Sequence, residues 1–226
     1  MRTNYKVISI VALVTGAVSA NAGSITANYS FQFTTGTSFI YNSNPQSPNA
    51  ALIQGVRTDL PAGIGVDSNV PKNFDAYCVE VGETIGGGSN THAQVLPLLG
   101  SVTASGGITG PVTFTAARTK ALETLWGSYK SAVVDAATST AFQIAQWEIT
   151  FDTGLDLTSG LMTASNAQAQ TWLTNIKNGT VTNRQALYHL KKDGLQDLVT
   201  PVPEPGTIAA LGLGIGALLK RRARKS

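Results

Sequence analysis

The chain has 226 residues, of which 42% are hydrophobic and 13% charged, and its formal net charge is +3. The positive charge belongs to the two ends, because residues 23–202 hold nine Lys and Arg against twelve Asp and Glu. That central stretch has no basic field, so no nucleic-acid partner is expected. It is long enough for one domain with a substantial core. Its low charge and its many Gly, Thr and Ser residues suit a β-rich exported protein.

The N-terminus has the pattern of a secretory signal peptide. Arg2 and Lys6 supply a positive region, residues 7–18 supply an apolar region, and Ala20-Asn21-Ala22 is a small-x-small cleavage site. Residues 1–22 are therefore predicted to direct export through the Sec pathway and to be removed. The mature protein is then expected to begin at Gly23.

Strands dominate the prediction for the first half of the mature chain. Apolar residues alternate with polar ones from Ile25 to Phe33, which predicts a half-buried strand. Residues 38–41 are expected to pair with this strand. Further along, the predictions are a loop at 42–48, an ambiguous stretch at 51–70, a strand at 74–81, a glycine-rich loop at 82–90, a turn region at 105–111 and a short strand at 112–115.

Helical spacing begins in the second half. Leu122, Leu125, Trp126 and Tyr129 predict an amphipathic helix over about 116–134. Further helices are predicted at 138–149, around 169–176 and at 183–192, with a last edge strand at 196–200. The fold is therefore interpreted as α+β. A single β-rich domain over residues 23–200, with an inserted helical section, lies between the signal peptide and a C-terminal membrane sorting helix.

The C-terminal tail, residues 201–226, has three parts. The motif Pro203-Glu204-Pro205 comes first, and an apolar stretch at 207–219 follows it. As a helix that stretch is roughly 20 Å long, against a bilayer core of about 30 Å, which suits a transient membrane segment. Five basic residues then favour a cytoplasmic end. These residues are Lys220, Arg221, Arg222, Arg224 and Lys225.

This tail resembles the PEP-CTERM sorting signal of Gram-negative bacteria that have an exosortase system. The resemblance implies an exosortase-type processing enzyme as a partner and an inner-membrane intermediate. It also implies a final place at the cell surface or in the extracellular matrix. Proteins with this signal are associated with exopolysaccharide and biofilm, so exopolysaccharide is a further expected partner.

Cys78 is the only cysteine, so an intrachain disulfide is excluded. Three interpretations stay open for its thiol. It is a buried apolar residue, it pairs with another molecule, or it is committed to other chemistry. An exposed free thiol is the least expected state, because thiols outside the cytoplasm tend to oxidise.

Two short motifs favour the third interpretation. Tyr77-Cys78-Val79-Glu80 and Gln143-Ile144-Ala145-Gln146-Trp147 together resemble the motifs of the bacterial thioester domain, also called the TQXA domain, of surface adhesins. The departures are Phe142 in place of Thr, and Gln146 in place of an apolar residue. The resemblance implies that Cys78 is the thiol and Gln143 the acyl donor of an internal thioester, with Tyr77, Glu80, Ala145 and Trp147 around it.

The chemistry of such a bond asks for these residue types. A thiolate must attack a carboxamide, which is a poor electrophile, so proximity has to supply most of the drive. Trp147 lies four residues after Gln143, on the same helical face, where it can shield the bond from water. The bond closes a loop of 66 residues, counting both ends. A surface or matrix amine or hydroxyl would then be acylated through Gln143 while Cys78 leaves.

Two functions are carried forward. The first is a covalent binding module at the surface or in the matrix. The second is a structural protein of the exopolysaccharide or biofilm matrix, in which Cys78 is merely buried. No metal is expected, because His92 and His189 have no metal-ligand neighbours. No turnover enzyme or cofactor is expected either, because the sequence has no Gly-x-Ser-x-Gly motif, phosphate loop or Ca²⁺ loop. His189 is expected at the surface, His92 in a loop, and Glu80 on a solvated edge rather than in a proton relay.

Overall fold

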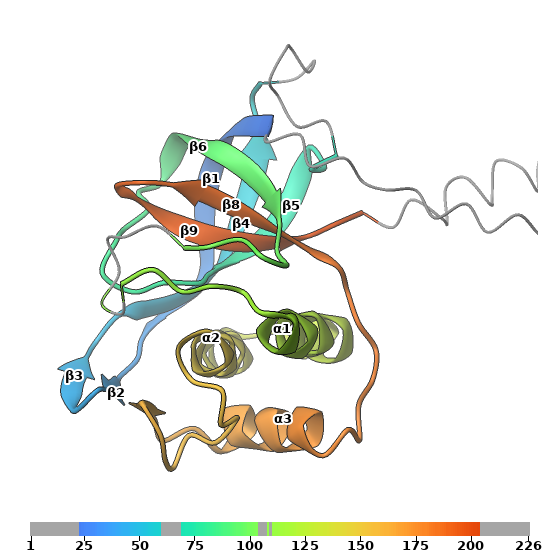
Figure 1. Ribbon diagram of the computed structural model, residues 1–226. Helices are drawn as coiled ribbons and strands as arrows, with labels where there is room; N and C mark the ends of the chain where they lie inside the picture. The colour runs from blue at the N-terminus through green and yellow to red at the C-terminus, as the bar shows by residue number, and fades with distance from the viewer. Residues whose placement is uncertain (1–22, 60–68, 104–107, 109, 204–226) are drawn as a thin grey trace, which may run out of the picture.

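The computed structural model describes residues 23–59, 69–103, 108 and 110–203, and it shows a strand barrel with helices packed against one end (Figure 1). Six strands close the barrel in the order β1-β4-β5-β9-β8-β6, and each neighbouring pair is antiparallel. Their bounds are Gly23–Gly36 for β1, Asn49–Arg57 for β4, Asn73–Cys78 for β5, Gly88–Pro97 for β6, Leu187–Lys192 for β8 and Leu195–Pro201 for β9. Closure pairs strands that are far apart in the sequence, which brings β5 beside β9.

The first strand follows the predicted alternation over part of its length. Alternate residues from Ile25 to Tyr29 are buried, but Phe31 is 38% exposed. The change lies next to an irregularity, because the register with β4 shifts between Gln32 and Thr35 and Phe33 has a φ of 55°. A bulge re-aims the side chains of a strand. Phe33, within the irregular stretch, is only half-buried but still packs against the core.

Residues 38–41 were expected to pair with the first strand, and this prediction is wrong. They form β2 (Phe39–Tyr41), which belongs to a separate three-stranded sheet of order β3-β2-β7, with β3 at Asn44–Gln46 and β7 at Met162–Thr163. The reason is the turn at Asn42 and Ser43, whose φ values are 46° and 65°. Two successive positive φ values make a tight hairpin, so β2 pairs with β3. The loop predicted at 42–48 therefore holds this turn and a short strand.

Three helices lie between β6 and β8 in the chain, and these three predictions are confirmed. Their bounds are Ala116–Tyr129 for α1, Ala136–Phe151 for α2 and Ala167–Lys177 for α3, with a short 3-10 turn at Lys130–Ala132. Side-chain caps start each helix: Thr115 for α1, Asp135 for α2 and Asn166 for α3. At α2, Asp135 and Thr138 form a reciprocal capping box.

The fourth predicted helix, at 183–192, is wrong. Most of that segment is β8, and the turn at Asp193 and Gly194 joins it to β9. Gly194 has a φ of 75°, and an Asp-Gly pair between two apolar runs is a hairpin signal, which overrides the helical spacing. The strand at 196–200 does exist. It is not an edge, however, because β9 pairs with β5 on one side and β8 on the other.

Strand β6 also has no counterpart in the prediction, and β4 lies largely in the stretch at 51–70 that was left ambiguous. Strand β6 begins at Gly88, inside the segment predicted as a glycine-rich loop. Its sequence is polar, and the side chain it buries most completely is His92, so no apolar alternation marks it. The short strand predicted at 112–115 is reduced to one bridge between Val102 and Thr113.

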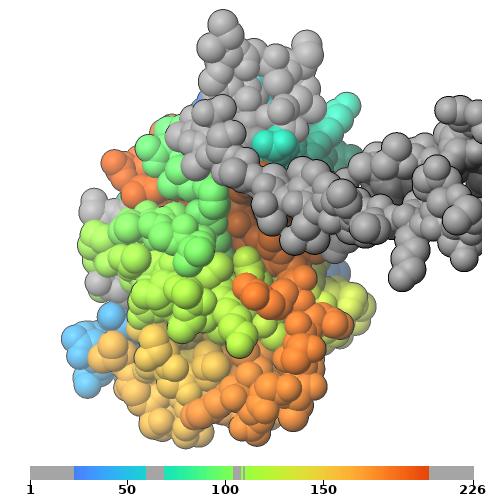
Figure 2. Space-filling model, turned by 45° about the vertical axis from the view of Figure 1, so that its right-hand side comes forward, coloured from blue at the N-terminus to red at the C-terminus, as the bar shows by residue number. Residues whose placement is uncertain are grey.

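Helix α2 occupies the centre of the molecule. It contacts β1, β4 and β5 of the barrel, and it also contacts α1 and α3. Every residue from 141 to 151 is consequently buried, which is the pattern of a helix packed on all sides. Figure 2 shows the helical part, in green to orange, as one solid mass against the barrel. Polar side chains on this helix must therefore find partners inside the protein.

The predicted signal peptide (1–22) and most of the tail (204–226) lie outside the described residues. Strand β1 begins at Gly23, the predicted first residue of the mature protein. Strand β9 ends at Pro201, and the backbone N–H of Val202 donates to the carbonyl of Ala186 at 2.8 Å. Within the described part of the chain, no helix has the length and apolar character needed to cross a membrane.

Candidate functional site

Cys78 is the last residue of β5, at a place where the barrel strands separate. The ladder between β4 and β5 stops at the pair Ile53 and Ala76, two residues before Cys78. On its other side Cys78 lies opposite Leu198 of β9, and the next residue, Val79, donates its N–H to β9 at 3.1 Å. In an antiparallel pair such bonds alternate along the strand. The N–H and C=O of Cys78 therefore point to the side that β4 has left.

The side chain of Gln143, from α2, fills this position. Its Oε1 accepts the backbone N–H of Cys78 at 3.2 Å, and its Nε2 donates to the carbonyl of Cys78 at 2.8 Å. Gln143 is fully buried, so these bonds compensate the desolvation of the carboxamide. The structure thus brings together the two residues that the sequence predicted as partners.

A second glutamine, one helical turn further, joins the same carbonyl. Nε2 of Gln146 donates to the carbonyl of Cys78 at 2.7 Å, and Oε1 of Gln146 accepts from Nε1 of Trp126 at 2.9 Å. In the resemblance to the thioester domain, Gln146 was only a departure from a position that is usually apolar. Its spacing of three residues from Gln143 places both amides on one face of the helix, which was the available signal.

The remaining predicted neighbours enclose the pair. Tyr77 is fully buried, its ring lies 4.8 Å from that of Phe142, and its hydroxyl is 3.0 Å from Oγ of Ser139. Ala145 is also fully buried. These contacts fix the end of β5 against α2.

A cavity of about 510 Å³ reaches Cys78 from the surface. It lies where β4 and β5 part, with walls from β1, from the 46–49 segment and from the segment after β5. Trp147 contributes to its wall and packs on Phe39 with ring centroids 5.4 Å apart. Nε1 of Trp147 is enclosed and has no hydrogen-bond partner among the described residues. Cys78 itself is 7% exposed, so its thiol is close to the cavity but not open to bulk water.

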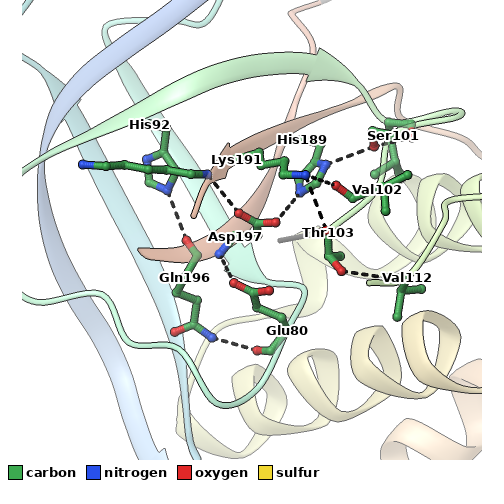
Figure 3. Close-up of polar contacts among 12 residues, drawn as sticks. Glu80, His92, Ser101, Val102, Thr103, Val112, His189, Lys191, Gln196 and Asp197 are labelled. Atoms are coloured by element: carbon green, nitrogen blue, oxygen red, sulfur yellow. Dashed lines mark hydrogen bonds and ion pairs between the residues drawn. The ribbon is translucent and has the colours of Figure 1, made fainter. Parts of the chain in front are cut away.

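Glu80 was expected on a solvated edge, and this prediction is wrong. It is 1% exposed, and its Oε1 accepts the backbone N–H of Asp197 at 2.7 Å (Figure 3). Burial, followed by the charge of Asp197, raises the pKa of Glu80 to about 8. The chain after β5 continues beside β9, so Glu80, two residues beyond the strand, is buried by its contacts with Gln196 and Asp197.

The two histidines lie in the same buried region. His92 is on β6, not in a loop: its Nε2 donates to the carbonyl of Gln196 at 3.1 Å, and its Nδ1 accepts from Tyr29 at 2.9 Å. Burial lowers the pKa of His92 to about 4, which keeps the ring neutral. With both ring nitrogens engaged, His92 is a structural element of the barrel.

His189 was expected at the surface, and this too is wrong, because it is fully buried on β8. Its Nε2 lies 3.1 Å from Oδ2 of Asp197, and its Nδ1 lies 3.0 Å from Oγ of Ser101. Figure 3 shows Asp197 between this ring and Glu80. Since the Ser101 hydroxyl donates its hydrogen to the carbonyl of Leu98 at 2.7 Å, it has no hydrogen to pass to His189. The contacts therefore indicate a structural network and not a nucleophile with its base.

The electrostatics around Cys78 oppose its ionisation. Burial, and after it the charge of Glu80, raises the pKa of the Cys78 thiol well above its usual range. The thiol is thus held in the protonated form. Meanwhile the Cys78 N–H polarises the carbonyl of Gln143, which favours attack at that carbon. No group of His, Cys, Asp and Glu side chains in the described part of the chain is arranged to hold a metal ion.

Comparison with known proteins gives one match, and it lies in the tail. A family model described as the PEP-CTERM protein-sorting motif matches residues 201–225. No curated protein and no solved structure matches the chain. The predicted motif Pro203-Glu204-Pro205 lies inside the matched range, so the prediction of this sorting signal is confirmed. The chain therefore carries the sorting motif of exported proteins that exosortase recognises and processes.

Proposed function

We propose that this exported protein binds a target at the cell surface or in the extracellular matrix covalently, through a thioester between Cys78 and Gln143. The observation that supports the proposal is the pairing of the Gln143 carboxamide with the backbone of Cys78 at 3.2 and 2.8 Å. This pairing holds the acyl donor on the residue that carries the thiol, next to a cavity that reaches the surface.

The bond would form by condensation. Sγ of Cys78 attacks Cδ of Gln143, the Cδ–Nε2 bond breaks, and the thiol proton leaves with the nitrogen as ammonia. The loss of Nε2 removes one hydrogen bond to the Cys78 carbonyl. That carbonyl keeps its bond from Gln146 at 2.7 Å, so the reaction leaves no buried acceptor without a partner. This gives Gln146 a role that an apolar residue could not fill.

The thioester would then react once with a nucleophile. An amine or hydroxyl in the cavity attacks the acyl carbon of Gln143, the carbon–sulfur bond breaks, and Cys78 leaves and is protonated. The product is an amide or ester between the target and residue 143. Such a module acts by single use, and the sorting motif delivers it to the outside of the cell.

A structural role in the matrix is the second candidate, and two observations favour it. Both polar groups of the Gln143 carboxamide are already satisfied, and the raised pKa of Cys78 keeps the thiol protonated. In this role the two residues only close the gap that β4 leaves at the end of β5. The delivery signal and the fold are the same in both candidates.

Intact mass spectrometry of the purified domain separates the two. A thioester makes the protein lighter than its sequence mass by one ammonia, and methylamine restores that mass with one added methylene and frees the thiol. Cys78→Ala and Gln143→Ala should show neither change. The full sequence mass, with a thiol that is labelled only after unfolding, would establish the structural role instead.

A further inference from the structure

The cavity beside Cys78 has one charged residue among the described side chains of its wall, and that residue is Glu83. The other polar groups in the wall are amides and hydroxyls, from residues such as Gln46, Asn49 and Thr84. A single carboxylate in such a wall attracts a cation and selects against an anion. The charge of Glu83 therefore influences which nucleophile enters the cavity.

Glu83 also interacts with a buried carboxyl group, that of Glu80. The carboxyl groups of Glu83 and Glu80 contact each other, and Oε2 of each is enclosed. The two carboxyl groups interact, since the charge of Glu83 is one of the causes that raise the pKa of Glu80. Glu80 in turn acts on Cys78. Glu83 therefore lines the same cavity as Cys78, and it interacts with Glu80, whose charge acts on the thiol.

The chemistry of the proposed transfer needs a proton acceptor at this position. A primary amine is protonated at neutral pH, and an ammonium group has no lone pair with which to attack. The leaving sulfur needs the opposite, because burial makes a thiolate at Cys78 unfavourable. A group that first takes a proton from the nucleophile and then supplies one to sulfur meets both needs.

We propose that Glu83 is the residue that selects and activates the nucleophile, by binding a primary ammonium group in the cavity and accepting a proton from it. This inference rests on the proposed thioester. The free amine attacks the acyl carbon of Gln143, and the carbon–sulfur bond breaks. Of the two protons that the ammonium group loses, one ends on Sγ of Cys78 and one stays on Glu83. Glu83 then releases that proton to water, and the charges balance.

The test compares two nucleophiles on the wild type and three variants. Methylamine is protonated at neutral pH, whereas hydroxylamine is largely uncharged there. The wild type, Glu83→Gln, Glu83→Asp and the control Asp193→Asn, a carboxylate in the exposed β8–β9 turn, are each weighed before and after timed exposure. All four should start with the mass deficit of one ammonia. Glu83→Gln should then react with methylamine about 100-fold more slowly, while its rate with hydroxylamine stays near that of the wild type.

The outcomes separate the two proposals. Partial recovery of the methylamine rate in Glu83→Asp, and an unchanged rate in Asp193→Asn, would support Glu83 as the acceptor. Equal slowing with both nucleophiles, or no slowing, would overturn the role of Glu83 and leave the thioester intact. A deficit that is present in the wild type but absent from Glu83→Gln would place Glu83 in bond formation and overturn its role with the nucleophile. Absence of the deficit in the wild type would overturn both proposals.

Discussion

Gln143 pairs with Cys78 as a neighbouring strand would. Its carboxamide presents one acceptor and one donor, and these meet the N–H and C=O of Cys78 at 3.2 and 2.8 Å. A peptide group of β4 would do the same, but the β4–β5 ladder has ended two residues earlier. One helix side chain therefore completes a sheet, and it fixes the position of the acyl carbon relative to the residue that bears the thiol.

Opening the proposed thioester should lower the stability of the domain. The bond closes a loop of 66 residues, and the chain-entropy model for cross-links gives roughly 4 kcal/mol for a loop of this size. Methylamine treatment should therefore lower the free energy of unfolding by up to about that amount. Chemical denaturation before and after treatment measures the change. Cys78→Ala, treated in the same way, should show no difference, and a similar loss in that variant would mean that methylamine acts elsewhere.

Gln146→Leu should destabilise the domain more than an exposed substitution of the same kind. The change removes the acceptor of Trp126 Nε1 and one of the two donors to the Cys78 carbonyl. Leaving a buried donor unpaired costs about 1–3 kcal/mol. Gln168→Leu, on the exposed face of α3, is the matched control and should change the unfolding free energy by less than about 0.5 kcal/mol. Equal effects of the two substitutions would contradict the assigned contacts.

The pair formed by Cys78 and Gln143 shows how much of the site the sequence could predict. Cys78 and Gln143 were found from short motifs, because an aromatic–cysteine strand and a Gln-x-Ala-x-Trp helix are local patterns. Gln146 and Trp126 were not assigned to the site. Their partners lie 68 and 20 residues away along the chain, and only the packing of α2 under the barrel brings them together.

The strands were predictable where one face is apolar, and not elsewhere. Ile25 to Tyr29 alternate as a half-buried strand, and this prediction is confirmed. Strand β6 buries His92, and β8 buries His189, so neither shows a clean apolar pattern. Barrel closure supplies the partners of these polar groups from other strands. It was the same closure that placed Glu80 and His189 inside when a surface position was expected.

The stability of the domain should fall as the pH rises from about 6.5 to 8. Burial raises the pKa of Glu80 to about 8 and that of Glu148 to about 7, from ordinary values near 4.5. Above pH 4.5 the unfolded chain therefore releases protons that the folded chain retains, and folding loses stability until the folded pKa is passed. His92, whose pKa is lowered to about 4, acts in the opposite direction, but only below its ordinary value of 6.5. Below that value one histidine opposes two carboxyl groups, so the decline should already begin at about pH 5.

Glu80→Gln tests this pH dependence. The amide keeps an acceptor for the N–H of Asp197 but does not titrate, so the fall between pH 6.5 and 8 should shrink by about 1–2 kcal/mol. Glu148→Gln should shrink it by less, because its pKa is closer to the start of the window. Thermal unfolding at steps of pH measures the slope. An unchanged slope in Glu80→Gln would mean that its carboxyl is ionised at neutral pH in the folded protein.

The sorting motif predicts processing at the C-terminus. In a host with exosortase, the mature protein should begin at Gly23 and should lack the segment after Pro203-Glu204-Pro205. Terminal sequencing of exported material checks both ends, and retention of Lys225 would contradict processing. In a host without the enzyme, limited proteolysis should cut after Pro203. The preceding residues are held to the domain, since Nε2 of Gln185 donates to the carbonyl of Val202 at 2.7 Å.

Trp147 should protect the proposed thioester from water. It is fully buried in the cavity wall and packs on Phe39, so its removal enlarges the cavity next to Cys78. Trp147→Ala should cost about 3–5 kcal/mol of stability and should shorten the half-life of the mass deficit in buffer several-fold, because water then reaches the acyl carbon of Gln143. Trp147→Phe keeps an aromatic ring against Phe39 and loses the rest of the indole, including an Nε1 that has no hydrogen-bond partner among the described residues, so its half-life should be much closer to that of the wild type than to that of Trp147→Ala. Time-resolved intact mass gives both rates. If the thioester is hydrolysed at the wild-type rate in both variants, another part of the cavity wall shields it, and Phe31 of β1 is the next side chain to truncate.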